Sequence, residues 1–162
     1  MKLFTIFTSL LVIPTSLAAV VYYDTVYDQA DEALASVACS NGDNGLITKY
    51  HWTDLGDVPN FPNVGAAFAV EGWNSKNCGT CWQLNYTVSA GHQNLVNILA
   101  VDVAGVDGFV ISRKAMDTLT NGRAVELGVA TITYKQIDGS LCGLPSVRCA
   151  ALNFWCNLLT YI

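Results

Sequence analysis

The chain has 162 residues, of which 13 are acidic and 8 are basic, and its formal net charge is −5. An acidic chain with scattered charges is a poor partner for nucleic acid or anionic membrane surfaces, so we expect neither as a ligand. Charged residues make up only 13% of the sequence, against roughly a quarter in typical domains, which predicts neutral, polar or apolar partners such as glycans and interfaces.

The first 18 residues have the pattern of a secretory signal peptide. A positive start is followed by an uncharged, mostly apolar stretch at residues 3–17, and Ser16 and Ala18 are the small residues that a signal peptidase reads. This stretch is shorter than the roughly twenty residues of a membrane span, and Pro14 interrupts it. We therefore predict a signal peptide at 1–18, a secreted protein and no membrane span.

Residues 19–145 are predicted to form one domain built mainly of β-strands. A first strand is expected at 20–23 and a short one at 34–39, and turn-forming residues punctuate the stretch 39–77. Alternating or continuous apolar patterns then predict three longer strands. These strands are expected at residues 81–88, 95–103 and 129–137.

One helix is predicted at residues 113–119. Ser112 is its N-cap, and Asn121 and Gly122 end it. The whole pattern therefore indicates a small β barrel with one or two short helices and long loops, a shell that needs covalent links to hold it.

A Cys-x-x-Cys pair, Cys78 and Cys81, is the most informative motif of the chain. Such a pair ligates zinc, exchanges thiols or anchors two separate disulfides. A zinc site needs more ligands at close spacing, and His51 and His92 are isolated. A redox pair sits at a helix start, whereas Cys81 opens a strand-like segment. In an exported protein, two structural disulfides are the favoured interpretation, without metal or cofactor. The cysteines concerned are Cys39, Cys78, Cys81 and Cys142.

The last segment, 146–162, is an atypical apolar tail. Arg148 is its only charge, and it adds Cys149 and Cys156 to the cysteines of the domain. We hypothesise that this tail is disordered or lies beyond the natural end of the protein.

Several segments, in order, resemble the cerato-platanins, a family of small secreted proteins of filamentous fungi. The resemblance runs from about residue 20 to residue 145, and the tail departs from it. The segments that carry the resemblance are VACSNGDNGL at 37–46, FPNVG at 61–65, GWN at 72–74, CGTCW at 78–82, AVD at 100–102 and GF at 108–109.

The resemblance implies a six-stranded double-psi β barrel, like the first domain of expansins and barwin, with disulfides Cys39–Cys78 and Cys81–Cys142. It implies a non-catalytic protein of the culture fluid and fungal cell wall that binds chitin or N-acetylglucosamine oligomers. It further implies that such a protein elicits plant defence or necrosis at the plant cell surface and self-assembles at interfaces. Some members loosen cellulose without hydrolysing it.

Asp102 ends an apolar strand and precedes a glycine-containing loop, a position where ligand chemistry tends to lie. Asp24 follows an aromatic pair on the first strand, as an aspartate does in the related family 45 endoglucanases. Two such carboxyl groups are necessary for glycoside hydrolysis, so a weak hydrolase using Asp24 and Asp102 is the alternative function. Each candidate also has an ordinary explanation as a turn or core residue. The candidate carbohydrate-binding residues are Tyr23, Asp24, Tyr27, Asn41, Asp43, Asp102 and Phe109.

Three further features lie outside this set of candidate residues. Asn85 begins the glycosylation sequon Asn-Tyr-Thr, although a position in a strand disfavours its use. Trp73 and Trp82, beside the cysteines, are expected in the core, whereas Trp52 is expected to be more exposed and to serve an interface.

Overall fold

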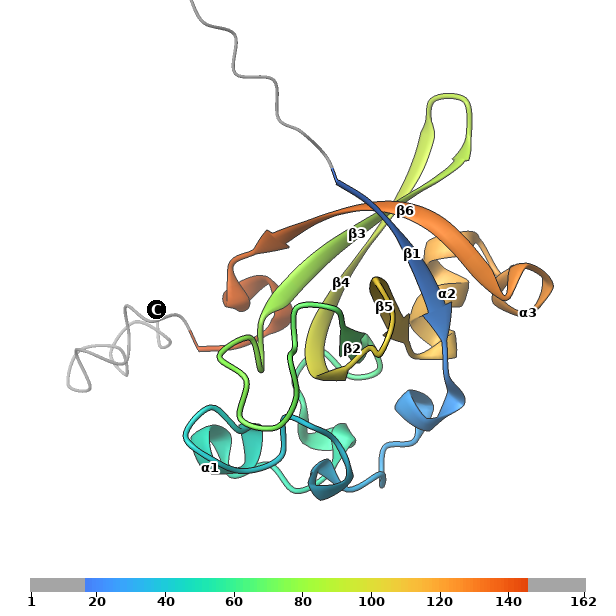
Figure 1. The fold of residues 1–162 in the computed structure, drawn as a ribbon. Coiled ribbons are helices and arrows are strands. Elements are labelled where there is room, and N and C mark those ends of the chain that lie inside the picture. The colour runs from blue at the N-terminus through green and yellow to red at the C-terminus, as the bar shows by residue number, and fades with distance from the viewer. Residues whose placement is uncertain (1–16, 146–162) are drawn as a thin grey trace, which may run out of the picture.

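The computed structural model describes residues 17–145. Within them, six strands close into a barrel in the order β1-β5-β2-β4-β3-β6 (Figure 1). The predicted fold class, a six-stranded double-psi β barrel with short helices, is confirmed, while the predicted tail at 146–162 lies outside the described residues. The strands are β1 (Leu17–Tyr23), β2 (Val64–Ala67), β3 (Cys81–Ser89), β4 (His92–Val103), β5 (Gly108–Ile111) and β6 (Val129–Ile137). The helices are α1 (Leu46–Tyr50), α2 (Arg113–Thr120), α3 (Ala124–Leu127) and the 3-10 turns η1 (Thr25–Asp28), η2 (Leu34–Ser36), η3 (Leu55–Asp57) and η4 (Gly139–Cys142).

Parallel and antiparallel pairs alternate irregularly around the barrel. β1 pairs with β5, and β2 with β4, in parallel, while the other neighbours are antiparallel. Two glycines lie where strands approach closely: a Cβ atom at Gly108 would collide with the carbonyl oxygen of Val20, and one at Gly65 with that of Val110. Glycine is required there because it has no Cβ.

Four aromatic rings from different parts of the chain pack together, two of them in the core and two against it. Phe68, Trp82, Phe109 and Tyr134 contact one another in all six pairings, with ring centroids 5.3–5.9 Å apart. Tilted and edge-to-face pairs of this kind stabilise by about 0.5–1.5 kcal/mol each beyond their area burial. The cluster therefore links the end of β2 with β3, β5 and β6, and it fixes the shape of the barrel.

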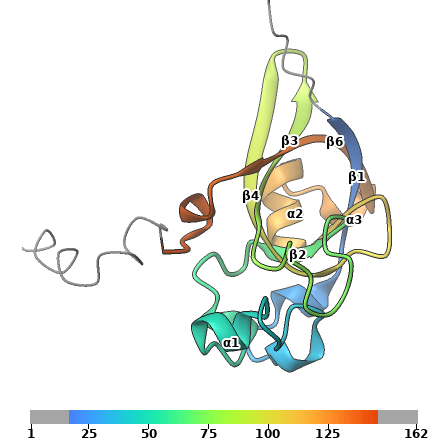
Figure 2. The ribbon, with the colours of Figure 1, turned by 60° about the vertical axis from the view of Figure 1, so that its left-hand side comes forward.

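The two ends of the barrel differ. The hairpin of β3 and β4 extends from one end, and α1 lies at the opposite end in both views (Figures 1 and 2). Because β4 runs away from the hairpin, its last residues reach the end where the long loops gather. We refer to this end, with residues 24–63 and 68–80, as the loop end.

The predicted helix is confirmed as α2. The Ser112 hydroxyl accepts a hydrogen bond from the Ala115 amide at 3.0 Å, and Asn121 ends the helix in the left-handed region, with φ of 60°. The buried face of α2, which includes Met116 and Leu119, packs against β3 and β4.

The predicted short strand at 34–39 is wrong. Residues 34–36 form the 3-10 turn η2, although Leu34 and Val37 are buried as the apolar pattern indicated. The segment is apolar at these positions because it packs its side chains on the barrel without forming a strand. It is attached to β4 at its end, where the Cys39 amide donates to the Val101 carbonyl at 3.1 Å.

Gly108→Ala is expected to lower the free energy of unfolding by about 3 kcal/mol or more, because its new Cβ meets backbone that cannot give way. Gly139→Ala is the matched control, since the nearest atom to its Cβ is the flexible end of Leu144, at 3.1 Å. The control is expected to change stability by less than about 1 kcal/mol. Urea denaturation of both variants measures this, and equal effects would contradict the close approach of β1 and β5.

Candidate functional site

One disulfide holds the loop end together. Cys39 and Cys78 are bonded across 39 residues of sequence. The Cys39 amide donates to Val101, and the amide of Gly79, next to Cys78, donates to Ala100 at 2.9 Å, so both sides of the bond are fastened to β4. As a result, the loops 40–46 and 71–77 start from one fixed point.

A second disulfide, Cys81–Cys142, ties the start of β3 to η4. The two pairings are those that the family resemblance implies. Among the described residues no cysteine is free, and no three His, Cys, Asp or Glu side chains gather as metal ligands. Two disulfides fit an oxidising, extracellular compartment.

Asp102 fastens three segments to one another. Its Oδ1 accepts hydrogen bonds from the amides of Ala38, at 2.9 Å, and Val103, at 2.8 Å, and its Oδ2 accepts one from the Tyr27 hydroxyl at 3.0 Å. The half-buried carboxylate therefore joins the end of β4 to η1 and to the segment before Cys39. It lies at the end of an apolar strand as predicted, and its contacts give it a structural role.

Tyr27 is buried against this carboxylate. Burial is the main cause that raises the pKa of the Tyr27 hydroxyl far above its ordinary value, and the charge of Asp102, its hydrogen bond and the charge of Asp24 add to the effect. A hydroxyl held neutral in this way is a fixed hydrogen-bond donor, so Tyr27 supports Asp102 rather than offering a surface to a ligand.

Asp24 lies one residue beyond β1 and is exposed. Its Oδ1 accepts a hydrogen bond from the Val26 amide at 2.9 Å and so caps η1. Its own backbone amide donates to the Ile111 carbonyl at 2.9 Å. Asp24 and Asp102 thus both act on Tyr27, and the structure brings these three predicted residues together.

Asn41 and Asp43 lie in the loop that follows Cys39, and both are exposed. The Asn41 Oδ1 accepts a hydrogen bond of 2.7 Å from the indole nitrogen of Trp73. Ala38 is only three residues before Asn41, so their Cα atoms lie within about 11 Å of each other. Asn41 is therefore near the segment that Asp102 fastens.

Three expectations about aromatic residues do not fit the structure. Phe109 is completely buried in the aromatic cluster, so it presents no face to a ligand. Trp73 was expected in the core with Trp82, but its exposed fraction is 64%, whereas Trp82 is buried as predicted. Trp52, expected to be exposed, is half-buried and stacks on Tyr50 with ring centroids 4.3 Å apart.

Tyr23 is half-buried and packs against the core from the end of β1. Asn85 lies within β3, paired with Leu95 of β4 and Thr133 of β6. Its side-chain nitrogen, the glycan acceptor atom, donates to Gln93 at 2.9 Å. Its amide oxygen is buried and has no partner among the described residues. The sequon is therefore built into the sheet.

A hollow of about 610 Å³ lies beside Trp73 at the loop end. Apart from the indole and one glycine, the residues that line it have polar or charged side chains, with amide, hydroxyl, carboxylate and ammonium groups. The lining residues are Asn44, Glu71, Gly72, Trp73, Asn74, Ser75 and Lys76.

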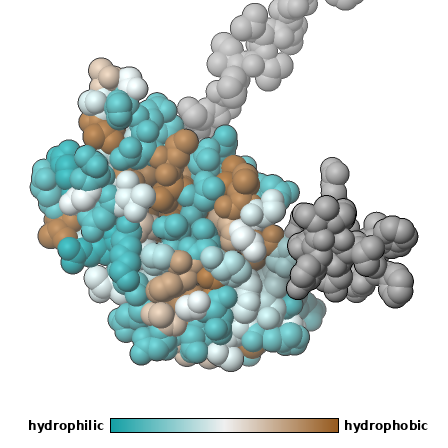
Figure 3. Space-filling view, turned by 180° about the vertical axis from the view of Figure 1, so that it is seen from behind, coloured by the Kyte–Doolittle hydropathy of each residue, from teal (hydrophilic) through white to brown (hydrophobic). Residues whose placement is uncertain are grey.

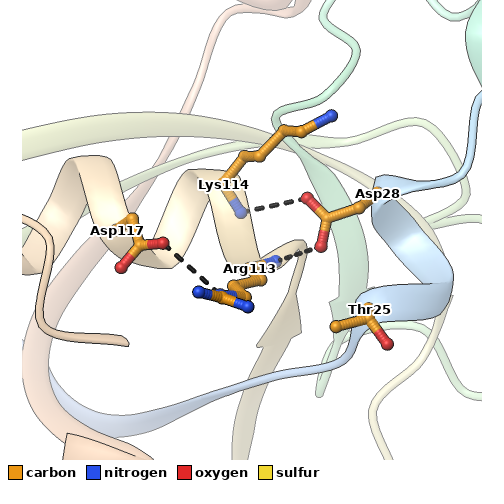
Figure 4. A pocket seen from close by; sticks show the side chains of 5 residues that line it. All are labelled: Thr25, Asp28, Arg113, Lys114 and Asp117. Atoms are coloured by element: carbon orange, nitrogen blue, oxygen red, sulfur yellow. Dashed lines mark hydrogen bonds and ion pairs between the residues drawn. The ribbon is translucent and has the colours of Figure 1, made fainter. Parts of the chain in front are cut away.

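A second hollow, of about 380 Å³, lies between η1 and the start of α2 (Figure 4). The Asp28 carboxylate accepts the amides of Arg113, at 2.9 Å, and Lys114, at 3.0 Å, and Arg113 also pairs with Asp117 at 3.6 Å. The first amides of α2 are thus already bound by Asp28, so this hollow does not offer them to an anion.

Exposed apolar side chains are scattered over the surface. On the face seen from behind, they form several small groups among hydrophilic residues rather than one large patch (Figure 3). Tyr22 and Val129 are one exposed pair, which face each other across β1 and β6. No helix among residues 17–145 is long and apolar enough to cross a membrane.

Comparison with known proteins gives one consistent result. The cerato-platanin family model matches residues 19–144. The heat-stable 19 kDa antigen of Coccidioides immitis (strain RS) is 49% identical over 122 residues, which cover 75% of this chain and 79% of the relative. The cerato-platanin of Ceratocystis fimbriata f. sp. platani is 41% identical over 137 residues, covering 84% and 95% respectively.

Solved structures agree. The crystal structure of cerato-platanin 2 from M. perniciosa has a TM-score of 0.73 at 40% identity, covering 78% of this chain and 99% of that one. The solution structure of the fungal elicitor cerato-platanin has a TM-score of 0.63 at 36% identity, covering 76% and 95%. The similarity therefore includes nearly the full length of both solved chains.

Tyr27→Phe is expected to destabilise the protein at pH 7 by about 1.5–3 kcal/mol, because it removes a hydrogen bond to a charged group. This difference is expected to shrink above pH 10. There the unfolded wild type ionises Tyr27, while the folded state, with its raised pKa, keeps the proton. Above pH 10 the free energy of unfolding of the wild type therefore falls by about 1.4 kcal/mol per pH unit from this group, whereas that of the variant does not.

Urea denaturation between pH 7 and 11 measures this, with Tyr22→Phe, an exposed tyrosine of the same barrel, as control. If the difference in free energy of unfolding between wild type and Tyr27→Phe stayed constant above pH 10, the buried hydrogen bond from Tyr27 to Asp102 would be contradicted.

Asp28→Ala is expected to lower the free energy of unfolding by about 1–2 kcal/mol, because two amides at the start of α2 lose their acceptor. Asp31→Ala, which removes an exposed carboxylate three residues away, is the control and is expected to stay within about 0.5 kcal/mol of wild type. Thermal unfolding of both variants tests this, and an unchanged midpoint for Asp28→Ala would show that the cap is dispensable.

Proposed function

The chain belongs to the cerato-platanin family, and we propose that it is a secreted, non-catalytic protein that binds chitin-type oligosaccharides at its loop end. The ligands are oligomers of N-acetylglucosamine, with cellulose as a second candidate. Through this binding it acts at the plant cell surface as an elicitor or phytotoxin, or as a wall-loosening protein. It resides outside the cell and in the fungal cell wall.

One observation carries the proposal: the short segment 38–41 of the loop end is hydrogen-bonded at both of its ends. The Ala38 amide donates to Asp102, and the exposed Asn41 side chain accepts from the Trp73 indole nitrogen, so these residues form one anchored surface. The disulfide Cys39–Cys78 lies beneath it and fixes both loops. A surface that is rigid before binding loses little entropy when a flexible sugar chain settles on it.

The chemistry of this surface suits a neutral sugar. Pyranose rings have polar edges and apolar C–H faces, so they need planar polar groups together with an aromatic ring. Asn41, Asp43 and Asp24 supply exposed amide and carboxylate oxygens, and Trp73 supplies the ring. The low charge content of the chain supports a neutral ligand as well.

The contacts of Asp102 argue against turnover. A glycosidase needs one carboxyl group that carries a proton and gives it to the leaving oxygen. Asp102 accepts three hydrogen bonds from the protein itself, two at Oδ1 from backbone amides and one at Oδ2 from the Tyr27 hydroxyl, so its carboxylate is engaged in holding the loops together. We therefore propose that Asp102 shapes the loop end and that the hydrolase alternative does not apply.

Secretion is supported by the signal-peptide pattern at 1–18 and by the two disulfides. The elicitor role is supported by the similar solution structure, which is described as that of a fungal elicitor. Self-assembly at interfaces is supported by exposed apolar residues such as Tyr22, Val125 and Val129, whose burial between copies would stabilise contacts.

Titration of the isotope-labelled mature protein with soluble N-acetylglucosamine oligomers is expected to shift amide resonances around Asp24, Asn41 and Asp43. The sugar spectrum should show no new reducing ends over time. A galacturonate oligomer of similar length is the control, because its negative charges are repelled by an acidic protein.

An absence of shifts at millimolar oligomer would remove the chitin-binding proposal. New reducing ends that disappear in Asp102→Asn would instead support the hydrolase.

A further inference from the structure

Trp73 stands out among the aromatic residues of the chain. Its exposed fraction is 64%, the largest among the exposed large apolar side chains of the described residues. A tryptophan buries 150–250 Å² when it packs, at about 25 cal/mol for each Å². Leaving most of an indole in water therefore forgoes considerable stabilisation, and an exposed indole is informative when it is also held in place.

The indole is held in place by a hydrogen bond and by the backbone. Its nitrogen donates to the Asn41 Oδ1 at 2.7 Å, which fixes the orientation of an indole that stays mostly exposed. On either side, Gly72 has a φ of 143° and Asn74 a φ of 61°. A positive φ costs energy in a residue other than glycine, so the left-handed backbone at Asn74 is maintained by the contacts around it.

The loop that carries Trp73 is clamped to its neighbour. The Asn44 amide donates to the Asn74 Oδ1 at 2.9 Å, and the Asn44 side chain donates to the Asn74 carbonyl at 2.8 Å. Gly42 lies so close that a Cβ atom there would be 2.7 Å from the Asn74 Oδ1. Together with the disulfide Cys39–Cys78, these contacts hold the loop that carries Trp73 in one conformation.

The hollow beside the ring supplies the polar partners of a sugar. Glu71 and Lys76 line it and are exposed, so both an acceptor and a donor are available for hydroxyl or acetamido groups. An apolar peptide side chain or a lipid would need a largely apolar pocket. Here the indole is the one large apolar surface of the lining, which favours a ligand with a single apolar face and polar edges.

We propose that Trp73 is the stacking platform of the carbohydrate site, on which one pyranose ring of a chitin-type oligomer lies, with its substituents directed into the hollow beside Glu71 and Lys76. Asn41 is the positioning residue that fixes the indole. This inference rests on the proposed function, because it names the part of the loop end that gives the oligomer most of its affinity.

The experiment combines calorimetry with the tryptophan indole ¹⁵N resonances, using N-acetylglucosamine oligomers as the probe. Trp73→Ala is expected to weaken binding about tenfold or more, as for a buried aromatic anchor. Trp73→Phe should recover part of the loss, and Asn41→Ala should weaken binding less than Trp73→Ala. Leu95→Ala, which removes another exposed apolar side chain, from the β3–β4 hairpin, is the control and should bind like wild type.

The indole resonance of Trp73 should shift on titration, while that of the buried Trp82 should not. Amide spectra of each variant establish that the fold is kept. Undiminished binding by Trp73→Ala, with shifts confined to Asp24 and Asp102, would overturn the platform and leave the proposed function standing. An absence of any shift or heat would overturn both, and binding of a peptide but of no oligosaccharide would do the same.

Discussion

The disulfide between Cys39 and Cys78 is the constraint on which the loop end depends. It closes a loop of 39 residues, and in the chain-entropy account such a link stabilises the fold by about 3–4 kcal/mol. Its position matters more than its strength, because both cysteines are fastened to β4 through neighbouring backbone hydrogen bonds. The loops 40–46 and 71–77 are thereby held in a fixed position relative to β4.

The barrel and the loops have different roles in the structure. The barrel is closed, with four mutually contacting rings packed in and against its core, and it provides a rigid base for the loops. The loops carry the exposed amides, carboxylates and the indole. Asp102 belongs to both parts, since it ends a buried strand and accepts bonds from Tyr27 and Ala38. This dual position explains why a carboxylate at a strand end need not be catalytic.

Patterns with a clear period were predictable from the sequence. The strand at 129–137 and the helix after Ser112 are found where alternation and capping place them. β2 was not predicted as a strand, because its four residues are all buried and have no alternation. The exposure of Trp73 was also missed, because it depends on left-handed backbone at Asn74 and on a partner, Asn41, that lies 32 residues away.

The central claim is that the loop end binds an oligosaccharide without cleaving it. Intermolecular nuclear Overhauser effects between the labelled protein and an N-acetylglucosamine oligomer test this most directly. The account predicts contacts from sugar ring protons to the Trp73 indole and to residues 41–44, with the oligomer intact at the end of the experiment. Contacts confined to the β3–β4 hairpin, or an oligomer shortened in the presence of the protein, would contradict it.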